Sequence, residues 1–177
     1  MPTKVYETRI RASVQSVWDF LASPLSLRLL TPPDQEMEIV SKDNQLREGV
    51  VQEFKTKQLG IWVTWKIRVT KVSAPRAYTY SGIKTPFKEF THHVDLIDDC
   101  GESIVRETVH YELKGGAIGN LVNAVSSDER LDKYFKFRQR TLRNHMETSK
   151  AAINAELFEK ETEYVSDFAL DEQKPVG

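Results

Sequence analysis

The chain has 177 residues, which suits one domain with a full core better than two domains. Its 25 basic and 26 acidic residues leave a formal net charge of −1, so the composition does not favour a general binder of nucleic acid or anionic membranes. The single cysteine, Cys100, excludes an internal disulfide framework and a cysteine-rich zinc site. The N-terminus is polar and no run of about 18 apolar residues exists, so we expect a soluble cytoplasmic protein without a transmembrane segment.

The first part of the chain predicts one strand followed by two short helices. Residues 4–11 alternate between apolar and polar side chains, which is typical of a half-buried strand. Ser13 is a candidate N-cap for a short amphipathic helix that ends at Ser23-Pro24. Residues 25–30 predict a second short helix, which the following pair of prolines ends.

A series of strands joined mainly by short turns follows. The alternation patterns predict them at residues 37–40, 49–58, 61–72, 78–81, 87–97 and 103–113. Tight turns are expected at Leu59-Gly60 and at residues 98–101, and a further turn or loop at 82–86. Strands that are joined by short turns must be antiparallel, because a parallel partner requires a long crossover.

The last long pattern, at residues 116–146, predicts one helix with a single buried face. Its apolar residues recur mostly at spacings of three and four, and a basic face lies opposite. That basic face consists of Arg130, Lys133, Lys136, Arg140 and Arg143. The sequence therefore predicts an α+β fold in which a curved antiparallel sheet of about six to seven strands wraps a long C-terminal helix. Residues 149–177 form an acidic extension, which we expect to be helical at first and mobile from about residue 167.

Four stretches of sequence carry a family resemblance. They are Leu30-Thr31-Pro32-Pro33, the hairpin from Leu59 to Trp65, the segment from Pro86 to His92, and the glycines at 116–119 with the later Tyr134-Phe135-Lys136-Phe137-Arg138. With the order of the elements, they resemble the helix-grip fold of the START and birch-pollen-allergen (SRPBCC) superfamily. The four stretches look like one bacterial branch of this superfamily, the polyketide cyclase/dehydrase-like proteins, and the resemblance covers about residues 4–146.

The resemblance implies a ligand-binding domain at residues 1–148. Its cavity would lie between the sheet and the long helix, with the short helices near its opening. Members of the superfamily bind lipids, sterols, polyketides, plant hormones or aromatic metabolites, and some are aromatases or cyclases. In the branch that this chain resembles, a second histidine often follows the first by two residues. Here that position holds Val94, which argues against a paired-histidine site.

Strand alternation predicts two ionisable side chains inside the fold. His92 shares a face with the apolar residues of strand 87–97, and Glu107 shares a face with those of strand 103–113. Because these strands form a hairpin, we expect both side chains to face the interior as neighbours. They could act as a proton-transfer pair or orient a ligand hydroxyl. The alternative is a structural hydrogen bond that satisfies two buried polar groups.

Several aromatic residues are expected on the same inner face, where they either line the cavity or fill it as core. The predicted ligand-binding set is Phe54, Trp65, Tyr78, Tyr80, Phe90, His92, Glu107, Val109 and Tyr111, and the candidates for catalysis are His92, Glu107 and Tyr111. A metal site is not expected, because His92 and His93 point to opposite faces of their strand and no H-E-x-x-H motif exists. No G-x-S-x-G elbow and no P-loop occur either.

Three functions remain open from the sequence. The first is non-catalytic binding or carriage of a hydrophobic small molecule such as a lipid, isoprenoid or polyketide-like compound. The second is a cyclase, aromatase or dehydratase that uses His92 and Glu107. The third is a protein-interaction module that uses Trp62 or the acidic extension. We expect no cofactor, no nucleic-acid partner, and a monomer or weak homodimer.

Overall fold

The computed structural model describes residues 2–58, 60–114 and 128–171, with side chains as far as Ser149. Its body is a seven-stranded sheet with the strand order β1-β7-β6-β5-β4-β3-β2, and every paired strand is antiparallel. The strands are β1 (Thr3–Ile10), β2 (Met37–Ile39), β3 (Val51–Gln58), β4 (Ile61–Ser73), β5 (Ala77–Lys84), β6 (Glu89–Asp99) and β7 (Glu102–Glu112). The helices are α1 (Val14–Ala22), α2 (Pro24–Leu29) and α4 (Asp128–Asp171). The predicted α+β helix-grip fold is confirmed.

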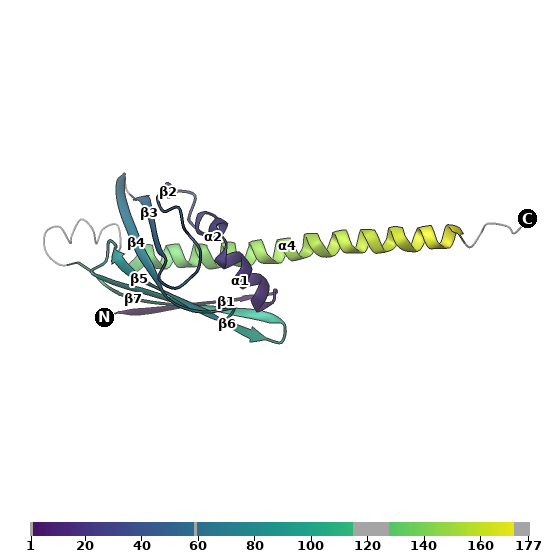
Figure 1. Cartoon of the computed structure of the whole chain (residues 1–177), viewed down its shortest axis with the longest axis horizontal. Coiled ribbons are helices and arrows are strands. Elements are labelled where there is room, and N and C mark those ends of the chain that lie inside the picture. Colours follow the sequence, from purple (N-terminus) through teal and green to yellow (C-terminus); the bar gives the residue numbers. More distant parts are fainter. Residues whose placement is uncertain (1, 59, 115–127, 172–177) are drawn as a thin grey trace, which may run out of the picture.

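The long helix α4 lies along the sheet near α1 and α2, and its later part extends past the sheet (Figure 1). The start that the sequence predicted, at residue 116, lies outside the described residues. The helix continues past Met146 to Asp171. The expected mobility from about residue 167 stays a prediction. Within the part of the chain that the structure describes, no helix has the length and apolar character to cross a membrane.

Local sequence signals explain two of the connections. Ser13 caps α1 as predicted, because its side-chain oxygen accepts a hydrogen bond from the Ser16 N–H at 3.2 Å. The β6–β7 hairpin turns at Cys100 and Gly101, whose φ angles are 54° and 85° between the paired residues Asp99 and Glu102. Positive φ at both positions is typical of the turn that matches the twist of two antiparallel strands.

The prediction of a turn or loop at residues 82–86 is wrong for its first part. β5 continues to Lys84 and stays paired with β4, with an irregularity in the register between Lys66 and Ile67. Gly82 serves close packing there: a Cβ at this position would lie 2.8 Å from Thr85 Cγ2 and 3.2 Å from Phe90 Cβ. The glycine that reads as a turn signal therefore lets the chain pass close to its neighbours.

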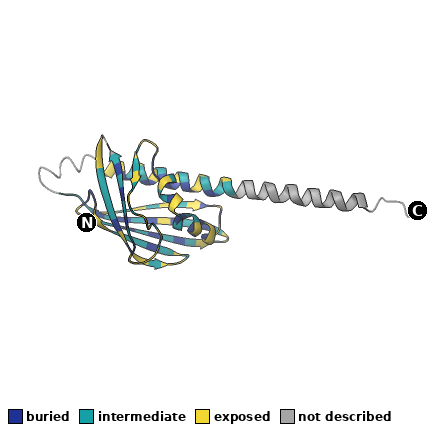
Figure 2. Ribbon diagram, turned by 45° about the horizontal axis from the view of Figure 1, so that its top comes forward, coloured by how far each residue is buried: buried dark blue, intermediate teal, exposed yellow. Residues whose placement is uncertain are grey.

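Two apolar clusters fill the space between the sheet and α4. In the first, Leu142 and Met146 pack with residues of α1 and with Tyr78 and Leu96 of the sheet. In the second, Leu131 and Phe135 pack with sheet residues and with Phe87. Figure 2 shows buried residues along the strands and on the part of α4 beside the sheet. The predicted basic face of α4 is exposed, as expected.

Candidate functional site

Three ionisable side chains meet between the two apolar clusters. His92 comes from β6, Glu107 from the neighbouring β7, and Arg138 from α4. Glu107 is 1% exposed, and the other two are each 8% exposed. Arg138 Nε donates a hydrogen bond to Glu107 Oε1 at 2.5 Å, and His92 Nε2 lies 3.3 Å from the same oxygen. The helix thus supplies a cation to a carboxylate that the sheet buries.

Mutual contacts fix the charge state of this cluster. Burial raises the pKa of Glu107, but the Arg138 charge and the contact with His92 outweigh it and lower that pKa to about 2. Burial also lowers the pKa of His92, against the opposing effect of Glu107. At neutral pH the cluster therefore holds an ionised Glu107, a charged Arg138 and a neutral imidazole.

The cluster is not fully hydrogen-bonded by the described residues. Three buried side-chain atoms have no hydrogen-bond partner among the described residues: Glu107 Oε2, His92 Nε2 and Gln139 Nε2. His92 Nε2 is close to Glu107, yet the two groups are not aligned for a hydrogen bond. Buried polar atoms in native proteins nearly always have a hydrogen-bond partner. These atoms therefore mark a place where a water or a ligand can form hydrogen bonds.

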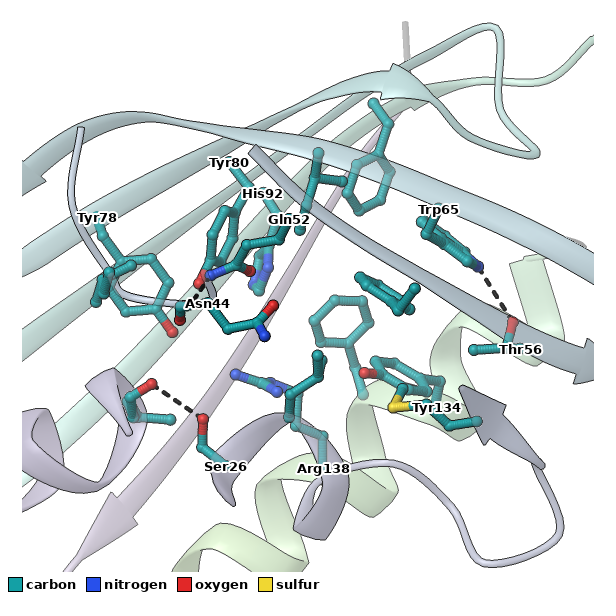
Figure 3. A pocket seen from close by; sticks show the side chains of 18 of the residues that line it. Ser26, Asn44, Gln52, Thr56, Trp65, Tyr78, Tyr80, His92, Tyr134 and Arg138 are labelled. Atoms are coloured by element: carbon teal, nitrogen blue, oxygen red, sulfur yellow. Dashed lines mark hydrogen bonds between the residues drawn. The ribbon is translucent and has the colours of Figure 1, made fainter. Parts of the chain in front are cut away.

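A cavity of about 150 Å³ lies beside the cluster (Figure 3). Its walls come from the sheet, from α1 and α2, and from α4. One end is aromatic: Trp65 stacks on Phe54 with 6.0 Å between ring centroids and meets Phe90 edge-on at 5.5 Å. The other end is polar, where Figure 3 shows Asn44, Gln52 and Tyr78 gathered near the guanidinium of Arg138.

Most of the predicted ligand-binding residues line this cavity. They are Phe54, Trp65, Tyr78, Tyr80, Phe90 and His92. Glu107 does not line it and acts on it only through His92 and Arg138. Val109 and Tyr111 also lie away from it, because Leu131 and Phe135 of α4 pack over this part of the sheet, and their part in binding stays a prediction. The Tyr111 hydroxyl donates a hydrogen bond to Asp128 Oδ1 at 2.5 Å, so its polar group serves the start of α4.

Sequence reasoning missed Arg138. The residue lies three positions after Phe135 and four before Leu142, both of which are buried, so helical spacing alone places it on the buried face. Its charge obscured that signal, since arginine is seldom buried without a partner. The polar residues Asn44 and Gln52 were also missed. Asn44 lies in a loop, and Gln52 shares the inner face of β3 with Phe54 but has a polar side chain that obscured its position.

The remaining histidines on the sheet are engaged elsewhere. His93 contacts Thr79 Oγ1 at 2.9 Å and Asp95 Oδ1 at 3.0 Å, on the face of β6 opposite to His92. His110 contacts Thr3 Oγ1 at 2.7 Å. Among the residues that the structure describes, no group of three or more histidine, cysteine, aspartate or glutamate side chains is placed to hold a metal ion.

A curved antiparallel sheet that wraps a long C-terminal helix, with a cavity between them, defines the helix-grip fold of the SRPBCC superfamily. The chain belongs to the polyketide cyclase/dehydrase and lipid transport family, whose model matches residues 2–147. No curated protein matches the chain in sequence.

Solved structures share this fold at low sequence identity. The aromatase/cyclase ZhuI of Streptomyces sp. R1128 is 16% identical with a TM-score of 0.64, over 82% of this chain and 93% of that one. A protein of Chromobacterium violaceum is 12% identical with a TM-score of 0.66, over 83% and 99% of the two chains. The major latex-like protein 151 of Panax ginseng is 13% identical with a TM-score of 0.61, over 82% and 97%. At these identities the likeness concerns the fold alone.

Proposed function

We propose that this protein binds a hydrophobic small molecule, of the lipid, isoprenoid or polyketide-like kind, in the cavity between the sheet and α4. The observation that carries the proposal is the cavity itself, whose aromatic end is built from Phe54, Trp65 and Phe90. Aromatic and aliphatic walls with a few polar groups are typical of small-molecule sites. Membership of a family described by lipid transport and polyketide chemistry supports the same reading.

Extraction of the purified protein under native conditions, followed by mass spectrometry, tests this proposal. A cavity-filling variant, Ala22→Phe, supplies the comparison, because Ala22 lines the cavity at the end of α1. Leu25→Phe is the matched control, since Leu25 is 60% exposed on α2 and does not line the cavity. We expect an apolar compound to accompany the wild type and Leu25→Phe but to be depleted from Ala22→Phe. Equal recovery from all three proteins, or no compound in any together with no uptake on titration, would contradict binding in this cavity.

A second candidate is an enzyme of the cyclase, aromatase or dehydratase kind. The observation in its favour is that His92 lines the cavity as a neutral imidazole backed by the Glu107 carboxylate. A neutral imidazole can accept a proton from a carbon next to a carbonyl, and the neighbouring carboxylate stabilises the imidazolium that forms. The imidazolium would then return its proton to the hydroxyl on the adjacent carbon. That hydroxyl would leave as water, which completes a dehydration.

A β-hydroxy ketone that gains ultraviolet absorbance when it loses water tests this candidate. We expect turnover by the wild type to fall at least about a hundredfold in His92→Gln if the histidine moves the proton. Turnover that is absent in the wild type, or unchanged in His92→Gln, would leave binding as the function.

A further inference from the structure

The guanidinium of Arg138 is a strong hydrogen-bond donor in the cavity wall. Arginine carries five N–H donors, and the bond to Glu107 uses Nε alone. The two Nη groups point into the polar end of the cavity, toward Asn44 and Tyr78 (Figure 3). Arg138 is 8% exposed as a residue, so bulk water offers these groups few acceptors.

The polar residues around it are neutral and are held in place by local hydrogen bonds, and the Tyr78 hydroxyl interacts with the guanidinium. The Ser26 hydroxyl lies 3.0 Å from the Leu21 carbonyl oxygen and 2.9 Å from the Ser23 carbonyl oxygen, so its one hydrogen is bonded at the end of α1. The Asn44 side chain accepts from the Ser41 hydroxyl at 2.6 Å and donates to the Ser41 carbonyl at 2.9 Å. Gln52 Nε2 donates to the Asn44 carbonyl at 3.0 Å. These residues hold their positions through local bonds, and the cavity remains without a second anionic acceptor for Arg138 among the described residues that line it.

The size and shape of the cavity limit what can supply that acceptor. A cavity of this order holds one aromatic ring. The distribution of side chains sets the orientation, because the Trp65 ring lies at the end away from Asn44 and Tyr78 (Figure 3). Phe90 meets this ring edge-on. A compact ring system would therefore pack on the aromatic end and direct one polar group toward Arg138.

We infer that the cavity selects compact ring compounds that carry a hydrogen-bond-accepting oxygen, a carbonyl or a carboxylate, which Arg138 binds through its Nη groups. The inference rests on the proposed binding function and names the chemistry of the ligand. Glu107 is a positioning residue in this account, since it orients the guanidinium through Nε and does not line the cavity.

A set of four single-ring probes tests the inference by nuclear magnetic resonance titration. The probes are ethylbenzene, acetophenone, benzoate and protonated benzylamine. Ethylbenzene is the most hydrophobic of the four probes and gains the most free energy when its apolar surface is buried. Tighter binding of an oxygen-bearing probe therefore cannot come from apolar burial. We expect acetophenone or benzoate to bind at least about tenfold more tightly than ethylbenzene, and benzylamine more weakly, because hydrogen bonds to a charged donor are strong and the donor repels a cation. The tighter of the two oxygen probes identifies a neutral carbonyl or a carboxylate as the acceptor.

The outcomes separate this inference from the proposed function. If ethylbenzene binds and neither oxygen probe binds more tightly, the inference is overturned while binding of apolar molecules stands. If none of the probes binds in the cavity, the proposed function fails with it.

Two variants assign the preference to Arg138. Arg138→Lys keeps a cation beside Glu107 but removes the Nη donors, and Glu107→Leu/Arg138→Met removes both charges together. In each folded variant we expect the preference for the oxygen probe over ethylbenzene to fall below about threefold, while ethylbenzene still binds. Arg140→Lys, on the exposed face of the same helix, is the control and should keep the wild-type preference. A preference that survives in both Arg138 variants would overturn the role of the guanidinium.

Discussion

The Glu107 carboxylate is buried between two apolar clusters, where an unpaired charge would be very costly. Arg138 compensates this charge directly through the bond at 2.5 Å to Glu107 Oε1, and His92 Nε2 lies 3.3 Å from the same oxygen. Breaking a buried pair by removing one partner is generally far more costly than replacing both partners with apolar groups. The stability of the folded protein therefore requires that the two charges be kept together or removed together.

The first prediction concerns the two ways of removing this pair. We expect Arg138→Met to lower the free energy of unfolding by about 3–5 kcal/mol, because it leaves Glu107 buried without its cation. The double variant Glu107→Leu/Arg138→Met should recover most of that loss. Urea denaturation followed by circular dichroism measures both values. If the free energy of unfolding of Arg138→Met lay within about 1 kcal/mol of the wild-type value, Glu107 would not need its cation for stability.

The second prediction is a dependence of stability on acid. The folded pKa of Glu107 is about 2, below its ordinary value of 4.5, so its contribution of about 3 kcal/mol is present above pH 4.5 and is lost as the pH falls toward 2. The folded pKa of His92 is also lowered, from 6.5, so the unfolded chain takes up a proton there first and stability begins to fall below pH 6.5. The free energy of unfolding, measured from pH 7 to pH 3, should decline more steeply in the wild type than in Glu107→Leu/Arg138→Met. Parallel curves would contradict the assignment to Glu107.

Strand alternation predicted that His92 and Glu107 face inward, and the burial of both residues confirms it. The same rule could not separate cavity lining from core, which depends on what the helix places against each strand position. Val109 and Tyr111 share the inner face but lie under Leu131 and Phe135. Arg138 could have been found from its helical spacing, had its charge been set aside.

At the scale of the elements, the close approach of β5 to the loop before β6 depends on Gly82. The third prediction is that Gly82→Ala lowers the free energy of unfolding by about 1–3 kcal/mol, since its Cβ would lie 2.8 Å from Thr85 Cγ2. Thr85 cannot move away easily, because its hydroxyl donates to the Phe87 carbonyl at 3.1 Å and accepts from the Phe87 N–H at 3.2 Å. Thermal denaturation measures the effect.

Ser81→Ala is the matched control for this change. It alters the neighbouring residue of the same strand, which is half-buried, and should stay within about 0.5 kcal/mol of the wild type. Equal stabilities of Gly82→Ala and Ser81→Ala would show that the close packing at Gly82 imposes no constraint.

The elements were largely predictable because their patterns are local. Alternation from Ile61 to Val69 marks β4, and Cys100-Gly101 marks a two-residue hairpin turn. The error at residues 82–86 arose because glycine serves equally in turns and in crowded strands, and only the neighbours distinguish them. The continuation of α4 past Met146 could be expected, because the residues after it are good helix formers.

At the scale of the whole molecule, the division at residue 148 remains a prediction. The family model ends at residue 147, and the described contacts of α4 with the body reach the same place. Met146 is buried in the first apolar cluster, the His145 ring lies 4.5 Å from that of Phe20, and the Arg11 N–H donates to Glu147 Oε1 at 3.3 Å.

The fourth prediction follows from these contacts. A chain that ends at Ser149 should unfold cooperatively, with a free energy of unfolding within about 1 kcal/mol of the full chain. Size-exclusion chromatography of both chains tests the interaction hypothesis at the same time. An oligomer formed by the full chain and lost on truncation would assign assembly to the extension, and loss of the cooperative transition would contradict the division into domain and extension.

The fold as a whole could be predicted, because the number and order of strands follow from pattern and the resemblance covers most of the chain. The cavity could not be located residue by residue. Its lining depends on how Phe54, Trp65 and Phe90 pack in three dimensions and on which residues α2 and α4 bring to them. Such contacts join residues far apart in the chain, and no periodic pattern in the sequence predicts them.

Binding in the cavity is the central claim, and the three tryptophans provide its most direct test. Trp65 lines the cavity and donates its indole N–H to Thr56 Oγ1 at 3.2 Å, whereas Trp62 is 47% exposed at the start of the same strand. Titration with acetophenone, followed through the indole N–H signals, should shift the Trp65 signal saturably and leave that of Trp62 unchanged. A Trp65 signal that stays fixed while the probe is in excess, or a shift confined to Trp62, would contradict the account.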